Sequence, residues 1–189
     1  MGSVESLTNV KKIVENINEP VVVVVSALGG ITDRLIRTSQ LAVAGDDNYR
    51  NEFDAMVDRH HGIIDAVIPA GAAHDTLKAK VDALLDELRS IYHGVYLIRD
   101  MTQKTANVIV SYGERMSSQI VSAFIEGSQC YDSREFIKTV RKQNRNLVDF
   151  DVTIRLVIQT FARMPRIAVV PGFIASDAND GETTNLGRG

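Results

Sequence analysis

Residues 20–32 have the sequence PVVVVVSALGGIT, the strongest structural signal in the chain. The five valines from Val21 to Val25 favour a β-strand, because β-branched side chains pack well on a pleated surface. The run does not alternate with polar residues, so both faces of the strand are predicted to be covered, as in the central strand of a parallel sheet. A glycine-containing loop then leads into residues 33–44, where apolar residues recur at helical spacing. This strand, loop and helix predict an α/β fold.

Two long helices are predicted next along the chain. Residues 51–68 have one apolar stripe, and residues 77–98 alternate apolar steps of four and three without a miss. A short turn of small residues, 69–73, separates them. We therefore expect an antiparallel helical hairpin over about residues 47–99 that buries its own apolar stripes. The residues of the second stripe expected to face the first helix are Leu84, Leu88 and Ile91.

The rest of the chain shows the same kinds of pattern. Further elements are predicted as helices over 4–16, 105–126 and 151–163, strands over 128–132 and 166–171, and a glycine- and threonine-rich tail over 172–189. Together they continue the α/β pattern.

The composition indicates one globular domain and excludes several classes of protein. The chain has 189 residues, 44% hydrophobic and 24% charged, which is close to the average for folded domains in water. Its 21 basic and 24 acidic residues give a net charge of −3 without a long basic run, so no nucleic-acid partner is expected. The most apolar stretch, residues 20–28, is far shorter than the roughly 20 residues that cross a bilayer, so no membrane partner is expected.

The cysteine and histidine residues argue against an intrachain disulfide and against a metal site. Cys130 is the only cysteine, which rules out an intrachain disulfide and a thiolate zinc cluster. The N-terminus also lacks the basic-then-apolar pattern of a signal peptide, so a cytoplasmic location is expected. His60 is expected to pack inside the hairpin, and His74 and His93 lack acidic or cysteine neighbours at ligand spacing. No metal site is predicted.

The loop over residues 26–32 is the first candidate site. It follows a buried strand and precedes a helix, where unpaired N–H groups and the helix dipole favour an anion such as a phosphate or a carboxylate. It is neither a Walker A loop nor a full dinucleotide fingerprint. The alternative is a tight turn in which Thr32 is the N-cap of the helix.

Two further segments hold candidate residues. Residues 113–117, GERMS, place Gly113 and Glu114 inside a helix, where glycine costs about 1 kcal/mol relative to alanine and so indicates a closely packed backbone or a ligand. The alternative is that Glu114 and Arg115 are solvated surface charges. Residues 171–174 and 181–189 are rich in glycine and threonine around one arginine, a composition suited to carboxylate or phosphate binding. The alternative there is a flexible tail.

In this order, the segments resemble the aspartate kinase family of the amino-acid kinase fold. SALGGIT resembles that family's Ser-Ala-x-x-Gly-x-Thr loop, SYGERMS its Gly-Glu-x-x-Ser helix, and PGFI and TTNLGRG its Gly-Phe-Ile and Thr-Thr-Leu-Gly-Arg-Gly segments. DSREF, residues 132–136, also falls where the family has a similar stretch. Two residues depart from the pattern, because Asn185 interrupts the threonine run and Glu182 stands at a place that is often basic. The resemblance covers residues 2–189 and implies a three-layer αβα sandwich with a mainly parallel central sheet.

The resemblance implies transfer of the ATP γ-phosphoryl group, with Mg²⁺, to the β-carboxylate of L-aspartate, the entry step to lysine, methionine and threonine synthesis. The nucleophile is already an anion at pH 7, so the reaction needs positioning and charge neutralisation rather than a base. Glu114 would pair with the α-ammonium group of aspartate, Arg188 with its α-carboxylate, and Phe173 would close the pocket wall. The implied site residues are, for aspartate, Ser26, Ala27, Thr32, Glu114, Phe173 and Arg188, and, for the nucleotide, Gly29 and Gly30.

The resemblance also implies that residues 1–189 are the N-terminal part of a kinase domain. The family's first strand, with its Lys-Phe-Gly-Gly-Thr-Ser loop, would precede Gly2, and the nucleotide-binding half and regulatory ACT domains would follow residue 189. The catalytic lysine and aspartate of the family would then lie outside the chain, so we expect no kinase activity from the chain alone. A non-catalytic fragment that binds an amino acid or a partner subunit is the alternative, and a homo-oligomer stays open. The Gly-Glu-x-x-Ser helix and the threonine-rich tail favour aspartate over another acid.

Overall fold

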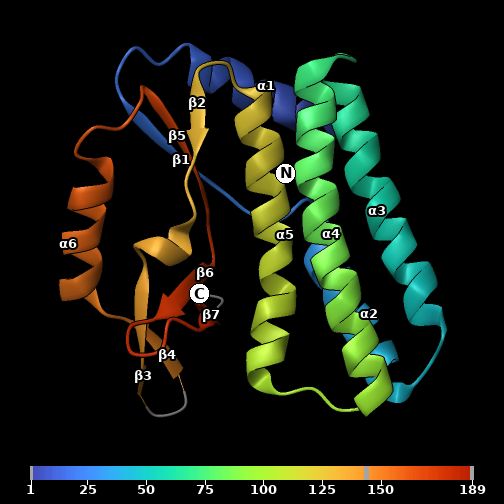
Figure 1. Ribbon diagram of the computed structural model, residues 1–189. Helices are drawn as coiled ribbons and strands as arrows, with labels where there is room; N and C mark the ends of the chain where they lie inside the picture. The colour runs from blue at the N-terminus through green and yellow to red at the C-terminus, as the bar shows by residue number, and fades with distance from the viewer. Residues whose placement is uncertain (1, 143–144, 188–189) are drawn as a thin grey trace.

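The computed structural model describes residues 2–142 and 145–187, which form a three-layer α/β structure (Figure 1). The helices are α1 (Val4–Glu15), α2 (Ile31–Ala44), α3 (Asn48–Val67), α4 (Ala72–Ile98), α5 (Gln103–Phe124) and α6 (Phe150–Phe161). Helices α2 to α5 lie on one side of the strands and α6 lies on the other (Figure 1). This arrangement confirms the predicted α/β sandwich.

The first sheet is parallel and has the order β1-β5-β2. Its strands are β1 (Val21–Val25), β5 (Ile167–Pro171) and β2 (Ser128–Cys130). The central strand is β5, and every one of its residues is buried. The prediction that β1 is covered on both faces is wrong, because Val22 and Val24 are 44% and 67% exposed. Valines alone do not distinguish a central strand from one that is packed on a single face.

The second sheet is mixed and has the order β4-β3-β6-β7. Its strands are β3 (Lys138–Lys142), β4 (Arg145–Val148), β6 (Ile174–Asp177) and β7 (Thr183–Asn185). The sequence did not predict β3 and β4, whose residues are mostly polar and half-buried or exposed. The alternative of a flexible tail is also wrong for residues 174–185, because β6 and β7 pair in an antiparallel ladder, Ile174 opposite Asn185.

Helices α3 and α4 run side by side as the predicted hairpin, but α4 also packs against α2 and α5 (Figure 1). The ring of Tyr92 on α4 meets Phe53 on α3 edge-on at 6.1 Å, and its hydroxyl donates to the carbonyl of Leu35 on α2 at 2.9 Å. Leu88 is fully buried, as predicted, and Leu85 and Tyr92 are buried beside it. Leu84 and Ile91, which were also predicted there, are only half-buried. Because α4 also packs against α2 and α5, its buried stripe passes through Leu85 and Tyr92 instead.

Candidate functional site

Helix α5 meets the loop after β1 at Gly113 and Glu114. Glu114 is 3% exposed, and its Oε1 accepts a hydrogen bond of 3.3 Å from the main-chain N–H of Ala27. One turn further on, Ser117 donates from its hydroxyl to the carbonyl of Ser26 at 2.8 Å. Glu114 is thus a buried carboxylate that supports the loop, and the alternative of a solvated surface charge is wrong.

Gly113 permits this close approach. A Cβ atom on Gly113 would lie 2.8 Å from the Cβ of Ala27 and 3.3 Å from Leu35 Cδ1 on α2. Such distances are shorter than van der Waals contact, so no larger residue fits without a shift of the loop. Gly113 therefore marks a point of close packing, as predicted.

Helix α2 begins directly after the two glycines of the loop. Its N-cap is Gly30, which has a φ of 81°, a conformation that glycine adopts at low cost. Thr32 is therefore in the first turn, and the alternative in which Thr32 is the N-cap is wrong. Ser26, Gly29 and Gly30 are exposed at this end of the sheet, whereas Ala27 is buried.

Phe173 forms the turn between β5 and β6 at the same edge of the sheet. It is one of two described non-glycine residues with positive φ, at 64°, and such strain in a non-glycine residue is a frequent feature of functional sites. The turn is fixed to β1, because the N–H of Gly172 donates to the carbonyl of Val25 at 2.7 Å. It is also fixed to the segment after β7, because the N–H of Leu186 donates to the carbonyl of Phe173 at 2.8 Å.

Thr32 and Phe173 line a common cavity of about 300 Å³. Its wall on α5 includes Ala106 and Val110, and Val110 precedes Glu114 by one helical turn, on the same side of the helix. The described residues around this cavity do not include Ser26 or Glu114, so the structure places the predicted residues in two adjacent groups. Arg188 lies outside the described residues.

A larger cavity of about 840 Å³ adjoins the first one. Both are bordered by Phe173, Asn107, Gln103 and Asn185. The larger cavity is also lined by Arg141 and Arg145 of the β3–β4 hairpin and by the acidic residues Asp177, Asp180 and Glu182. Sequence reasoning missed this wall because it did not predict the hairpin.

The two departures from the family pattern both contact the start of α5. Glu182 forms an ion pair with Lys104. The side-chain amide of Asn185 donates to the carbonyl oxygen and to Oδ1 of Asn107, at 3.4 Å in each case. These contacts join the β7 segment to the helix that also presents Glu114.

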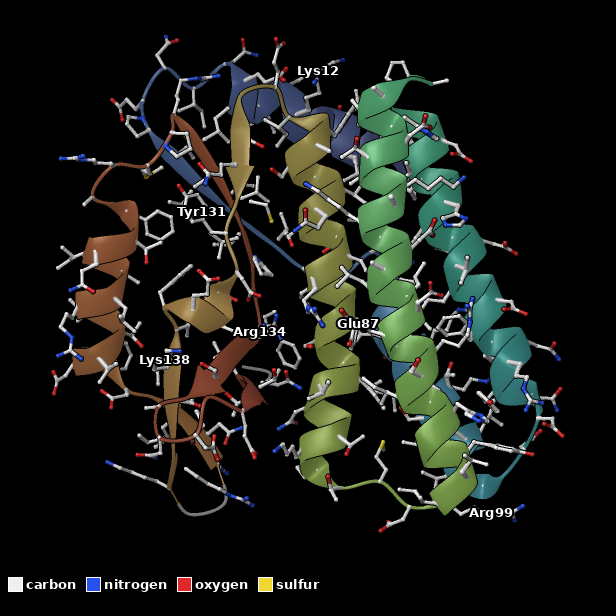
Figure 2. All side chains as sticks on the ribbon, in the orientation of Figure 1. Lys12, Glu87, Arg99, Tyr131, Arg134 and Lys138 are labelled. Carbon is white, nitrogen blue, oxygen red and sulfur yellow. The ribbon has the colours of Figure 1, made fainter. Side chains whose placement is uncertain are left out.

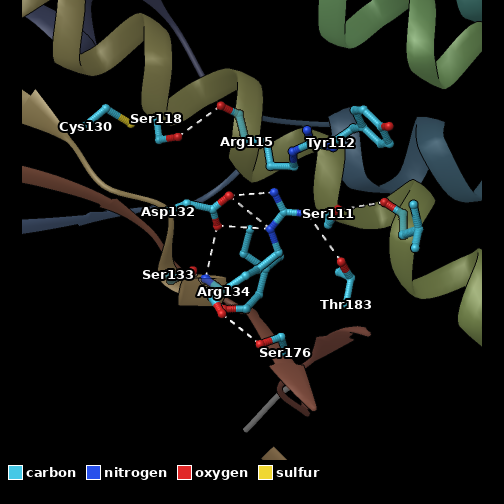
Figure 3. Close-up of polar contacts among 12 residues, drawn as sticks. Ser111, Tyr112, Arg115, Ser118, Cys130, Asp132, Ser133, Arg134, Ser176 and Thr183 are labelled. Atoms are coloured by element: carbon cyan, nitrogen blue, oxygen red, sulfur yellow. Dashed lines mark hydrogen bonds and ion pairs between the residues drawn. The ribbon is translucent and has the colours of Figure 1, made fainter. Parts of the chain in front are cut away.

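A second polar group lies on the other side of α5 and includes residues that sequence reasoning did not assign. Tyr112 donates from its hydroxyl to Glu87 on α4 at 2.9 Å, and the Arg115 guanidinium lies 4.4 Å from the centre of the Tyr112 ring. Asp132, the N-cap of the 3₁₀ turn η1 (Ser133–Glu135), and Arg134 within that turn lie nearby (Figure 3). Figure 2 shows Arg134 and Glu87 in the whole molecule. The only sequence signal was the DSREF stretch.

Comparison with known proteins assigns the chain to a family. Residues 1–189 match the family model described as the amino acid kinase family. The chain belongs to that family. Within this family it is similar to a bifunctional aspartokinase/homoserine dehydrogenase 1, chloroplastic, of Zea mays, with 29% identity over 97% of the chain and 21% of the relative. It is similar to aspartokinase 1, chloroplastic, of Arabidopsis thaliana, with 24% identity over the whole chain and 34% of the relative.

A solved structure has the same fold as this chain. E. coli aspartokinase III in complex with aspartate and ADP superposes with a TM-score of 0.85 and 23% identity, over 100% of this chain and 41% of that one. The chain therefore spans between about a fifth and two fifths of the proteins it matches. No helix among the described residues is long and apolar enough to cross a membrane. Since the relatives are described as chloroplastic, the cytoplasmic location stays a prediction.

Proposed function

We propose that this chain forms the aspartate-binding part of an aspartate kinase, which transfers the γ-phosphoryl group of ATP to the β-carboxylate of L-aspartate. The observation that supports this most directly is the contact between Glu114 and the loop at Ala27. It unites two of the three family motifs in space, and Phe173 of the third motif lies at the same edge of the sheet. The names of the relatives support the same reaction class.

Glu114 is proposed to hold the α-ammonium group of aspartate. A carboxylate that is almost fully buried attracts an ammonium group more strongly than an exposed one, because water screens the charge less. Its hydrogen bond from Ala27 restricts the direction in which the carboxylate points. Thr32 and Phe173, which share a cavity, are proposed to border the rest of the amino acid, and Arg188 is proposed from its motif alone to bind the α-carboxylate.

The loop at Gly29 and Gly30 is proposed to bind one phosphate group of ATP. Both glycines are exposed, and Gly30 caps the N-terminus of a 14-residue helix, where the helix dipole favours an anion. ATP supplies the phosphoryl group when bound. No set of three His, Cys, Asp or Glu side chains suited to a metal ion occurs among the described residues, so we assign no residue of this chain to Mg²⁺.

Aspartate binding can be tested on the 189-residue chain itself. We expect L-aspartate to cause saturable chemical-shift changes in the ¹⁵N spectrum, concentrated at the Ser26 loop and around Glu114. L-Asparagine is the matched control for the β-carboxylate, and Glu114→Gln is the matched variant because it keeps the size of the side chain and removes its charge. Aspartate titration without saturable changes would refute the proposed site.

Phosphoryl transfer needs a separate experiment. Aspartate-dependent ADP release should be measured in a coupled assay on the chain and on the longer protein of which it is proposed to be a part. We expect release only from the longer protein, and Glu114→Ala should abolish it there. Aspartate binding without ADP release in either form would favour the alternative, a non-catalytic amino-acid-binding protein of the same fold.

A further inference from the structure

Arg134 is held by a partly buried ion pair within its own turn. Its Nε donates to both carboxylate oxygens of Asp132, at 3.0 and 3.1 Å, and its Nη2 donates to Oδ2 at 2.5 Å (Figure 3). Burial alone would raise the pKa of Asp132, but the hydrogen bonds and charge of Arg134 outweigh it and hold that pKa below its ordinary value. The guanidinium is therefore fixed in direction by a charged partner.

The other terminal nitrogen of the Arg134 guanidinium, Nη1, contacts strand β7. Nη1 of Arg134 donates to the hydroxyl of Thr183, the first residue of β7, at 3.3 Å. The carbonyl of Arg134 accepts from the hydroxyl of Ser176 on β6 at 2.7 Å and from Nζ of Lys138 on β3 at 2.8 Å. One residue thus contacts three strands of the second sheet.

The position of β7 determines where the segment after it can lie. β7 has only three residues, and its next residue, Leu186, donates to the strained Phe173 turn. A displacement of Thr183 would therefore be transmitted within three residues to the Phe173 cavity. The Thr184 hydroxyl, 2.8 Å from that of Thr139, supports the strand from the opposite side.

We propose that Arg134 is a positioning residue for the aspartate site, which it serves by fixing Thr183 and hence the residue 183–187 segment beside Phe173. This inference rests on the proposed function. Arginine suits the task because its planar fork can donate to a carboxylate and to a hydroxyl at once. Lysine has the same charge, but its three donors share one nitrogen, so it does not reproduce a planar fork whose separate nitrogens donate to Asp132 and to Thr183.

The test is a set of variants of the 189-residue chain, titrated with L-aspartate by NMR. Thr183→Val removes the hydroxyl with little change of shape, and we expect aspartate affinity to fall about tenfold, the usual effect of losing a hydrogen bond to a charged group. Thr183→Ser should restore affinity to about the parent value, because it keeps the acceptor. Arg134→Lys should weaken binding as Thr183→Val does, and Arg155→Gln, at an exposed position on α6, is the control.

The outcomes distinguish the inference from the proposed function. If the parent chain does not bind aspartate, both fail. If the parent binds and either Thr183→Val or Arg134→Lys binds equally well, only the positioning role fails. A loss of affinity that Thr183→Ser does not restore would also contradict it, since the hydroxyl would not be the contact that matters. Melting temperatures are measured on the same samples. Thr183→Val and Thr183→Ser should have similar melting temperatures although their affinities for aspartate differ.

Discussion

Glu114 Oε1 accepts a hydrogen bond from the N–H of Ala27, although the two residues are 87 positions apart in the chain. The contact joins the middle of a long helix to the loop after the first strand, and both partners are buried. Its structural and functional roles can be separated by substitution.

Glu114→Ala should lower the free energy of unfolding by about 1–3 kcal/mol, because the buried N–H of Ala27 loses its acceptor. Glu114→Gln should cost less, since an amide oxygen can still accept from that N–H. Both should lose aspartate binding, which depends on the charge. Urea denaturation measures the first effect and NMR titration the second. Equal stability of the Ala and Gln variants would contradict the structural role of the hydrogen bond.

Gly113→Ala should destabilise the chain by about 1–3 kcal/mol, despite the better helix propensity of alanine, because the new methyl group would overlap Ala27. Gly94→Ala is the matched control. Gly94 lies inside α4, and a Cβ atom there would meet nothing within 4 Å. We expect that variant to gain up to about 1 kcal/mol. Thermal or urea unfolding of the two variants measures the difference, and effects of the same sign would show that packing at Gly113 is not tight.

Val24→Thr should change the free energy of unfolding by less than about 0.5 kcal/mol, because the Val24 side chain is mostly exposed. Val169→Thr should cost about 1–3 kcal/mol, because it places a hydroxyl inside the fully buried strand β5. The two residues lie in adjacent strands of one sheet, so local sheet propensity is nearly matched. A large cost at Val24 in urea unfolding would indicate that the outer face of β1 is covered in solution.

His60 should make the chain less stable in mild acid. Burial lowers the pKa of His60 to about 4 from an ordinary value of 6.5, and its Nδ1 lies 2.8 Å from the carbonyl oxygen of Met56. Between pH 6.5 and 4 the unfolded state therefore binds a proton that the folded state does not. The contribution of His60 to stability is complete above pH 6.5 and is lost as the pH falls through this range, at up to about 1.4 kcal/mol per pH unit.

The pH dependence can be isolated with one variant and one control. Urea denaturation between pH 7 and pH 4.5 should show a shallower pH dependence for His60→Gln than for the parent chain. His93→Gln, at an exposed position on α4, should follow the parent. Identical slopes for His60→Gln and the parent would mean that His60 titrates normally.

The sequence by itself determined the helices, the strands β1, β2 and β5, and the identity of the motif residues. These features are local, because apolar periodicity, a run of β-branched residues and the glycines at helix ends act through neighbours in the chain. Gly113 could be recognised in the same way, since a glycine inside a helix has a cost that packing must offset.

Only the tertiary structure decided which face of β1 is covered, which side chains of α4 are buried, and that residues 174–185 form the paired strands β6 and β7. The strands β3 and β4 have mostly polar sequences, so they leave no apolar periodic signal. They pair with each other as a hairpin, and β3 also pairs with β6, which is far away in the chain. The contact between Arg134 and Thr183 also could not be predicted from the sequence, because the hydrogen bond between them spans 49 positions. Contacts between segments this distant depend on how the whole chain packs, and that information is not present in any one stretch of it.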